Sequence, residues 1–116
     1  MAAINAKNLY GTVDLLVLKM LGLGGPKHGL AIADEIRAAS GDRLIIEEGA
    51  LYPALHRLQQ AGLIEGEWRI SDKRRRAKFY DITPAGNKEL HRALQEWTNH
   101  TRAVRMVLDV AWGDLR

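Results

Sequence analysis

One stretch in the middle of the chain limits its fold more than any other, because a helix pattern, a glycine stop and two strand patterns follow one another there. Within residues 49–62, Leu51, Leu55 and Leu58 recur at spacings of four and three, the repeat of a buried helix face. The glycine at position 62 is a typical helix stop. We therefore predict a helix over residues 50–61, with Pro53 in or near its first turn, where the missing N–H costs least.

Two short strands are predicted directly after this helix. Leu63–Trp68 and Lys78–Thr83 both contain β-branched and aromatic residues, and the loop between them is basic. Segment 69–78 carries one acid, Asp72, against six basic residues: Arg69, Lys73, Arg74, Arg75, Arg76 and Lys78. A helix, a hairpin and a basic loop in this order are typical of a winged helix-turn-helix, which places one helix in the DNA major groove and a charged loop beside it.

Two further helices are predicted before this unit. The first covers about Leu9–Leu23 and is ended by the glycines and the proline at positions 22–26. The second covers about His28–Ala39, with an inward face formed by Leu30, Ile32, Ala33 and Ile36. The segment Leu44–Ile46 is short and rich in β-branched residues, so we predict an extended piece that pairs with the hairpin.

A long helix is predicted over Pro84–Trp112, with Thr83 as its N-cap. At 1.5 Å per residue it would be roughly 40 Å long. A heptad seam with one polar interruption runs along it: Leu90, Leu94, Trp97, Thr101, Val104, Leu108 and Ala111. Such a seam needs a partner, and a second copy of the chain is the simplest one. We therefore expect a homodimer held by Leu90, Leu94, Trp97, Val104 and Leu108.

The expected fold class is mostly α with a small β-hairpin, because 116 residues give room for one core. We assign residues 1–83 to a winged helix-turn-helix DNA-binding part and residues 84–116 to a long C-terminal dimerisation helix. The absence of cysteine excludes disulfides, thiolate metal sites and cysteine nucleophiles. The N-terminal residues lack the build of a signal peptide, and no apolar run approaches the roughly 20 residues that span a bilayer. We expect a cytoplasmic protein with no membrane partner.

Double-stranded DNA is the expected partner, although the net charge of +3 says little by itself. A solvated helix face beside a charged loop is the plainer alternative. In the DNA reading, basic side chains neutralise phosphates and polar side chains of the helix meet base edges. The residues expected at phosphates or in the minor groove are Lys73, Arg74, Arg75, Arg76 and Lys78, and the candidates for sequence readout are Tyr52, His56 and Arg57.

We find no pattern of catalytic residues, metal ligands or phosphate-binding glycines in the sequence. Glu47 and Glu48 precede the predicted recognition helix, where acids suit the positive end of the helix dipole, and no nucleophile or second base accompanies them. The histidines at positions 28, 56, 91 and 100 are not at metal-ligand spacings. The glycines at positions 22–25 follow a helix and lack the Lys-Ser/Thr of a phosphate loop. We expect no enzyme activity, no metal and no cofactor.

Two tryptophans of the last helix are candidates for the dimer interface. We expect Trp112 to pack there. Trp97 lies in the middle of the seam, where two copies related by a two-fold axis can form an indole platform for a flat, apolar ligand, or can simply pack. For the whole chain, the alternative is a winged helix that serves as a protein-interaction module. That alternative leaves the basic cluster without a purpose.

Several motifs resemble the PadR family of bacterial transcriptional regulators, over about Gly11–Val104. The most specific pair is the block Leu-Tyr-Pro-Ala-Leu-His-Arg-Leu at 51–58 and the block Arg-Arg-Ala-Lys-Phe-Tyr at 75–80. The single C-terminal helix resembles the compact subgroup of that family. The resemblance implies a dimeric repressor on a palindromic operator, with the C-terminal helix contacting the N-terminal helix of the partner. It also implies an aromatic effector between the C-terminal helices, on a tryptophan at the position of Trp97.

The chain departs from the family pattern at three positions. Ala50 stands where many relatives have Ser or Thr, which removes a hydroxyl contact to phosphate. Leu30 and Ala31 replace a common Tyr-Gly, which removes a phenol from the second helix. These departures affect particular DNA contacts and leave the implied fold unchanged.

Overall fold

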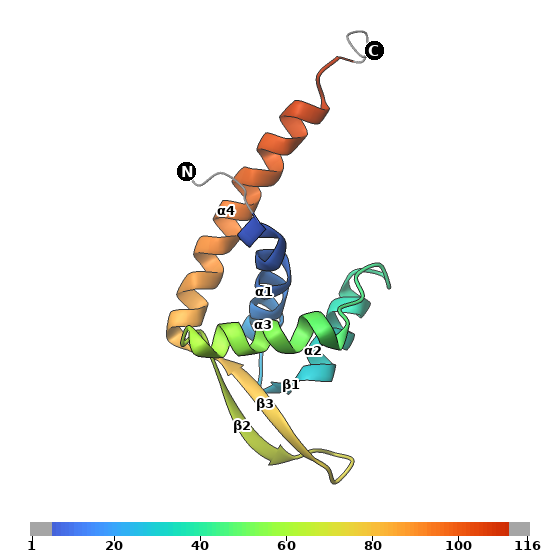
Figure 1. Cartoon of the computed structure of the whole chain (residues 1–116), viewed down its shortest axis with the longest axis vertical. Coiled ribbons are helices and arrows are strands. Elements are labelled where there is room, and N and C mark those ends of the chain that lie inside the picture. Colours follow the sequence, from blue (N-terminus) through green and yellow to red (C-terminus); the bar gives the residue numbers. More distant parts are fainter. Residues whose placement is uncertain (1–5, 112–116) are drawn as a thin grey trace.

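Four helices and one small antiparallel sheet make up the structure, a computed structural model that describes residues 6–111, with side chains from residue 11 on (Figure 1). The elements are α1 (Ala6–Gly22), β1 (Lys27–His28), α2 (Gly29–Ala39), α3 (Glu48–Gln60), β2 (Ile64–Ile70), β3 (Arg76–Ile82) and α4 (Pro84–Leu108). The strands lie in the order β1-β3-β2, and both pairings are antiparallel. The predicted class, mostly α with a small β-hairpin, is confirmed.

The hydrophobic core forms where α1 packs against α2, α3 and the first turns of α4. The predicted buried face of α3 is confirmed, because Leu51, Leu55 and Leu58 are 0%, 1% and 3% exposed. Each such side chain contributes about 2 kcal/mol through its burial. The other core residues are Val17, Leu18, Met20, Leu21, Ile32, Ile36, Ile64, Tyr80 and Leu90. Because this face of α3 is buried in the core, the opposite face of the helix is exposed beside the hairpin.

The third strand of the sheet is not the one predicted. Leu44–Ile46 was expected to pair with the hairpin, but it lies in the connection between α2 and α3 with Ile45 61% exposed. The two residues of β1 pair with β3 instead, with Lys27 opposite Tyr80 and His28 opposite Phe79. Because β2 takes the other edge of β3, β3 has a neighbour on both sides. The third strand of the sheet is therefore β1, which leads directly into α2.

Two local predictions in the helices were wrong. Leu30 was expected to face inward, but it is 49% exposed, because it lies two residues, or about 200°, from the buried Ile32. Pro53 was expected in or near the first turn, but α3 begins at Glu48, which places the proline in the second turn. Glu47 occupies the N-cap position of α3 without a capping hydrogen bond from its side chain.

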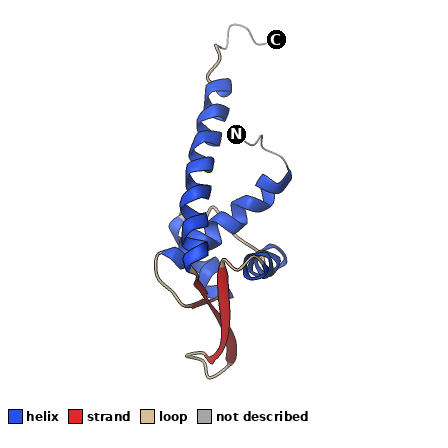
Figure 2. Cartoon of the chain, turned by 90° about the vertical axis from the view of Figure 1, so that its left-hand side faces the viewer, coloured by secondary structure: helices blue, strands red, loops and turns tan. Residues whose placement is uncertain are grey.

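Helix α4 leaves the globular part and projects away from it, opposite the hairpin (Figure 2). It ends at Leu108, earlier than predicted, and Trp112 lies outside the described residues. Leu90, predicted to face a partner, is 5% exposed and belongs to the core of its own chain, and Leu94 packs against the same core. The part of the seam that is free for a partner therefore begins at Trp97.

The start of α4 is anchored on the end of α3. The Thr83 hydroxyl accepts a hydrogen bond from the Gly86 N–H (3.0 Å) and donates one to the Gly62 carbonyl (2.7 Å), which confirms the predicted N-cap. A Cβ at position 86 would overlap the carbonyl oxygen of Leu63. The backbones of α4 and of the β2 start therefore approach each other at a distance that only glycine allows.

We expect Gly86→Ala to lower the free energy of unfolding by about 3 kcal/mol, because backbone must move to admit the methyl group. Thermal and urea unfolding, followed by circular dichroism, measure this. The matched control is Gly11→Ala in α1, where a Cβ meets nothing within 4 Å. That variant should be neutral or slightly stabilising. Equal stability of the two variants would contradict the close approach.

Candidate nucleic-acid interface

The exposed face of α3 presents polar side chains beside the hairpin. Tyr52 is 42% exposed, and His56, Gln59 and Gln60 are also exposed. Gly29, at the start of α2, lets the Tyr52 ring lie against it, because a Cβ there would come within 3.1 Å of the ring. The glycine thus leaves room for the Tyr52 ring against the start of α2.

Arg57, expected to read sequence, is held by an aspartate of α1. Its guanidinium contacts both carboxylate oxygens of Asp14, with Nη2 to Oδ1 at 2.7 Å and Nε to Oδ2 at 3.4 Å. The two side chains are 39% and 24% exposed, so the pair is partly shielded from water. The geometry favours a structural role for Arg57, which ties α3 to α1, over contact with bases.

We expect Asp14→Asn to lower the free energy of unfolding by about 1 kcal/mol, a modest value because Arg57 is partly exposed. Urea unfolding measures the loss. Asp34→Asn on α2 is the matched control, since this exposed aspartate undergoes the same change of charge. An equal loss of unfolding free energy in both variants would contradict a structural role for the Asp14–Arg57 pair.

The hairpin ends in a compact turn over residues 71–75. The Ser71 N–H donates to the Arg75 carbonyl at 2.7 Å, and the Arg74 N–H donates to the Ser71 carbonyl at 2.8 Å. Arg74 adopts a φ of 57°, in the left-handed region that non-glycine residues rarely enter. Lys73, Arg74 and Arg75 are exposed in this turn, so three positive charges project from its end.

The remaining basic residues lie on the strands and rest on aromatic rings. The Arg76 guanidinium is 4.6 Å from the centroid of Trp68, and the Lys78 ammonium is 5.7 Å from that of Tyr80. The Arg69 guanidinium is 5.9 Å from the centroid of Phe79 and also forms a 3.1 Å ion pair with Glu67. Sequence reasoning missed Trp68. The alternation of side chains along a strand is the signal that could have placed it on the face of Arg76 and Lys78.

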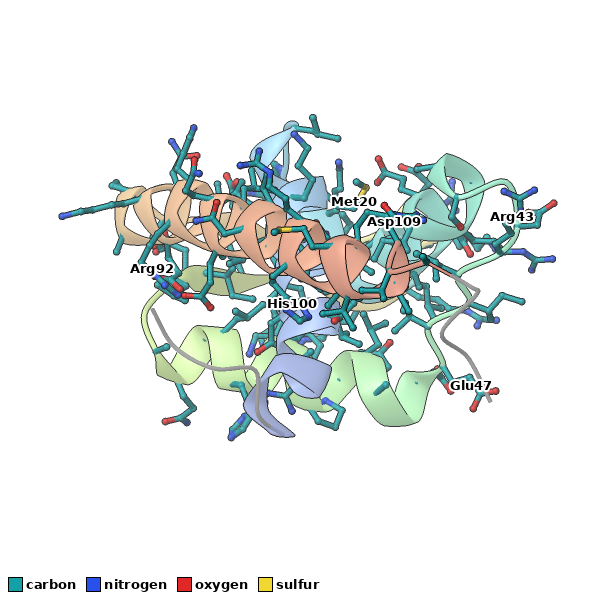
Figure 3. All side chains as sticks on the ribbon, turned by 90° about the horizontal axis from the view of Figure 1, so that it is seen from above. Met20, Arg43, Glu47, Arg92, His100 and Asp109 are labelled. Atoms are coloured by element: carbon teal, nitrogen blue, oxygen red, sulfur yellow. The ribbon has the colours of Figure 1, made fainter. Side chains whose placement is uncertain are left out.

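Acidic residues lie at the other end of α3. Glu47 lies at the start of α3 (Figure 3). Glu47 and Glu48 are exposed, and the Glu47 side chain makes no capping hydrogen bond. Their position suits the helix dipole, as expected from the sequence.

Trp97 on α4 is 41% exposed and lies edge-on to His100, with ring centroids 5.9 Å apart. In the view of Figure 3, His100 leaves α4 on the side where α1 lies. Arg92, five residues before Trp97 in α4, forms ion pairs with Glu89 at 2.6 Å and with Glu96 at 2.7 Å. The hydrogen bond from Arg92 lowers the pKa of Glu89, and the hydrogen bonds to Glu89 and Glu96 raise the pKa of Arg92. The charges of Arg92, Glu89 and Glu96 are therefore paired with one another within α4.

Among residues 6–111, no group of three or more histidine, cysteine or acidic side chains is arranged to hold a metal ion. No helix in the same range is long and apolar enough to cross a membrane. A helix packed beside α2, an exposed polar face, and a hairpin with a basic tip together define a winged helix-turn-helix protein of the DNA-binding class.

Comparison with known proteins narrows this class. Residues 17–92 match the transcriptional regulator PadR-like family. The chain belongs to this family, whose members are DNA-binding transcriptional regulators and not enzymes.

Individual relatives agree with the assignment. The chain is 42% identical over 72 residues to the transcriptional regulator Rv3488 of Mycobacterium tuberculosis, a match that covers 60% of this chain and 64% of that one. A solved transcriptional regulator from Clostridium thermocellum is similar with a TM-score of 0.75 and 28% identity, covering 90% and 97% of the two chains. A solved PadR family transcriptional regulator from Eggerthella lenta is similar with a TM-score of 0.73 and 30% identity. The match covers 90% of this chain and 88% of that one.

Proposed function

We propose that the chain works as a homodimer that occupies a palindromic operator and represses transcription. The observation that carries this proposal is the exposed apolar surface of the distal half of α4, far from the basic hairpin (Figures 1 and 2). Trp97 and Val104 are each 41% exposed, and Leu108 is 65% exposed. A helix that exposes such side chains over several turns is stable in water only when a partner covers them.

The apolar surface is wider than the predicted heptad seam. Val107 lies beside the seam and is 71% exposed, and Val110, just after the end of α4, is 60% exposed. A single partner helix covers a narrow seam, whereas this stripe requires contact with more than one element. An arrangement in which α4 packs against both α4 and α1 of the second copy, as the family resemblance implies, meets this requirement.

In this proposal, residues 1–83 bind DNA and residues 84–116 join the two copies. Tyr52 and His56 are the side chains of α3 that we place at base edges, and the hairpin contacts phosphates or the minor groove through Lys73, Arg74, Arg75, Arg76 and Lys78. Two such units linked by α4 reach half-sites about one helical turn, or roughly 34 Å, apart. The dimer then represses by covering a promoter in the cytoplasm.

An aromatic effector at Trp97 is the finer part of the proposal. It would lie between the two copies of α4 and change their angle, and with it the distance between the two recognition helices. We expect 9-aminoacridine to quench the tryptophan fluorescence with a dissociation constant in the micromolar range and one molecule per dimer. Trp97→Ala should weaken this binding about tenfold, whereas Trp68→Phe should leave it unchanged. Equal quenching in the Trp97→Ala variant and the natural chain would contradict an effector site at Trp97.

Sedimentation with a 30-bp duplex tests the proposed function. At moderate salt, we expect complexes that contain two chains per duplex, and free protein that sediments as a dimer. A complex with one chain per duplex, or free protein that stays monomeric at micromolar concentration, would contradict the dimeric mode of action.

A further inference from the structure

A cleft of about 430 Å³ opens between the start of α2, the exposed face of α3 and the hairpin. Three large side chains on its walls are exposed to solvent: Leu30, Tyr52 and Trp68. Two cations, Arg76 and Lys78, also line the cleft, and none of the acidic side chains among residues 11–111 does. The cleft therefore suits an occupant that is partly apolar and negatively charged.

One wall of the cleft is an open strand edge. β1 is two residues long and pairs with β3 only at Phe79 and Tyr80. The chain turns into α2 at Gly29, so in the part of the chain that the structure describes no strand pairs with residues 76–78 of β3 on this side. Ala77, the middle residue of this open edge, lines the cleft. The open edge presents backbone N–H and C=O groups to which a further strand can bond.

We propose that the open edge is a docking site for an extended acidic peptide of a partner protein, which adds to the sheet as a strand beside residues 76–78. The peptide continues the line of β1 past the point where the chain turns into α2. Because side chains alternate along a strand, the peptide residues opposite Arg76 and Lys78 lie two apart and on the face of those cations. The recognised motif is therefore acid-x-acid, with an apolar residue opposite Ala77.

The open edge selects a peptide over a nucleic-acid strand. The phosphates of a DNA strand accept hydrogen bonds and donate none, whereas an extended peptide offers donors and acceptors in the alternating pattern of a strand edge. The two cations require the peptide to be acidic. Burial and the nearby Tyr52 raise the pKa of Tyr80. The Tyr80 phenol in the cleft is therefore uncharged at neutral pH and does not repel a carboxylate.

The docked peptide and DNA compete for the same cations. Arg76 and Lys78 are two of the residues that the proposed function places at phosphates, and a strand beside them covers both. A partner that carries the acid-x-acid segment therefore releases the chain from DNA. This release rests on the proposed function, whereas the docking itself does not.

Selective N-methylation tests strand addition on the full natural chain without DNA. The probe is acetyl-Val-Glu-Val-Glu-Val-amide, titrated into isotope-labelled protein and followed by NMR. One methylated form blocks the amides of the two Glu residues, and the other blocks those of the central and last Val. Because the amides of an added strand point alternately toward β3 and away from it, we expect the affinities of the two forms to differ about tenfold. Equal affinities, or no binding of the parent peptide, would overturn strand addition.

Charge variants test the acid-x-acid motif. The natural chain should bind the Glu peptide about tenfold more tightly than acetyl-Val-Gln-Val-Gln-Val-amide, which lacks both ion pairs. Arg76→Ala/Lys78→Ala should abolish this preference. Lys73→Ala/Arg74→Ala removes the same charge from turn residues that do not line the cleft, and it should keep the preference. Equal preferences in the two double variants would overturn the pairing of the acids with Arg76 and Lys78.

Fluorescence anisotropy with a labelled duplex separates the docking from DNA binding. The Glu peptide should release the duplex from the natural chain, and the Gln peptide at the same concentration should not. A chain that binds the Glu peptide but no duplex would contradict the proposed function and leave the docking site intact. A complex that holds the peptide and the duplex together would contradict the competition.

Discussion

Replacing Arg75 and Arg76 with alanine weakens binding to any DNA duplex by about 100-fold near physiological salt, because two charge-assisted contacts to phosphate are lost. The same variant lowers the slope of log affinity against log salt by roughly two units, one for each contact. Fluorescence anisotropy with a labelled duplex at several salt concentrations measures both quantities. Sequence preference should change little, since phosphate contacts carry no base information.

A matched double variant separates the contacts from the total charge. Lys19→Ala/Lys88→Ala changes the net charge from +3 to +1, just as the arginine variant does, but removes two exposed lysines of α1 and α4. We expect it to retain nearly all of the affinity. If the lysine variant loses as much affinity and as much salt slope as the arginine variant, the hairpin is not a phosphate clamp.

Val104→Glu converts the protein into a monomer at micromolar concentration. Val104 lies in the exposed apolar stripe of α4, and in a two-fold dimer the two introduced carboxylates would face each other in a dry interface. We expect the dimer dissociation constant to rise by at least 100-fold, and affinity for a two-half-site DNA to fall with it. Sedimentation velocity measures the first effect and anisotropy the second. The site is preferable to Leu94, because Leu94 also packs on the core of its own chain.

Gln95→Glu is the control for this substitution. It adds the same charge nine residues earlier, two and a half turns away, and so on the opposite side of α4. This variant should remain dimeric. A Val104→Glu protein that sediments as a dimer would mean that another surface joins the two copies.

Features with a strong local cause were predictable from the sequence. The buried face of α3 follows from three leucines at helical spacing, and the start of α4 follows from the N-cap at Thr83. The hairpin was located to within one residue at each outer end and two residues at each inner end, because its strands flank a polar, basic turn. In each case, residues close in sequence determine the structure.

Features that depend on distant residues were not predictable. The role of Arg57 depends on Asp14, 43 residues earlier, and no local sequence pattern predicts that ion pair. Leu90 continues the heptad spacing, but α1 covers it, so periodicity alone assigned it to the wrong partner. The choice of β1 over Leu44–Ile46 as the third strand depends on which segment meets β3 in space. The cleft beside Trp68 requires three elements to come together.

Selection of bound fragments from the source genome tests the central claim most directly. The purified full chain is mixed with genomic fragments near physiological salt, where non-specific binding is weak, and the retained DNA is sequenced. The account predicts enrichment of a two-fold symmetric site, with half-sites about one helical turn apart, in a promoter region. A folded, dimeric protein that enriches no sequence, or that enriches only sites without symmetry, would contradict it.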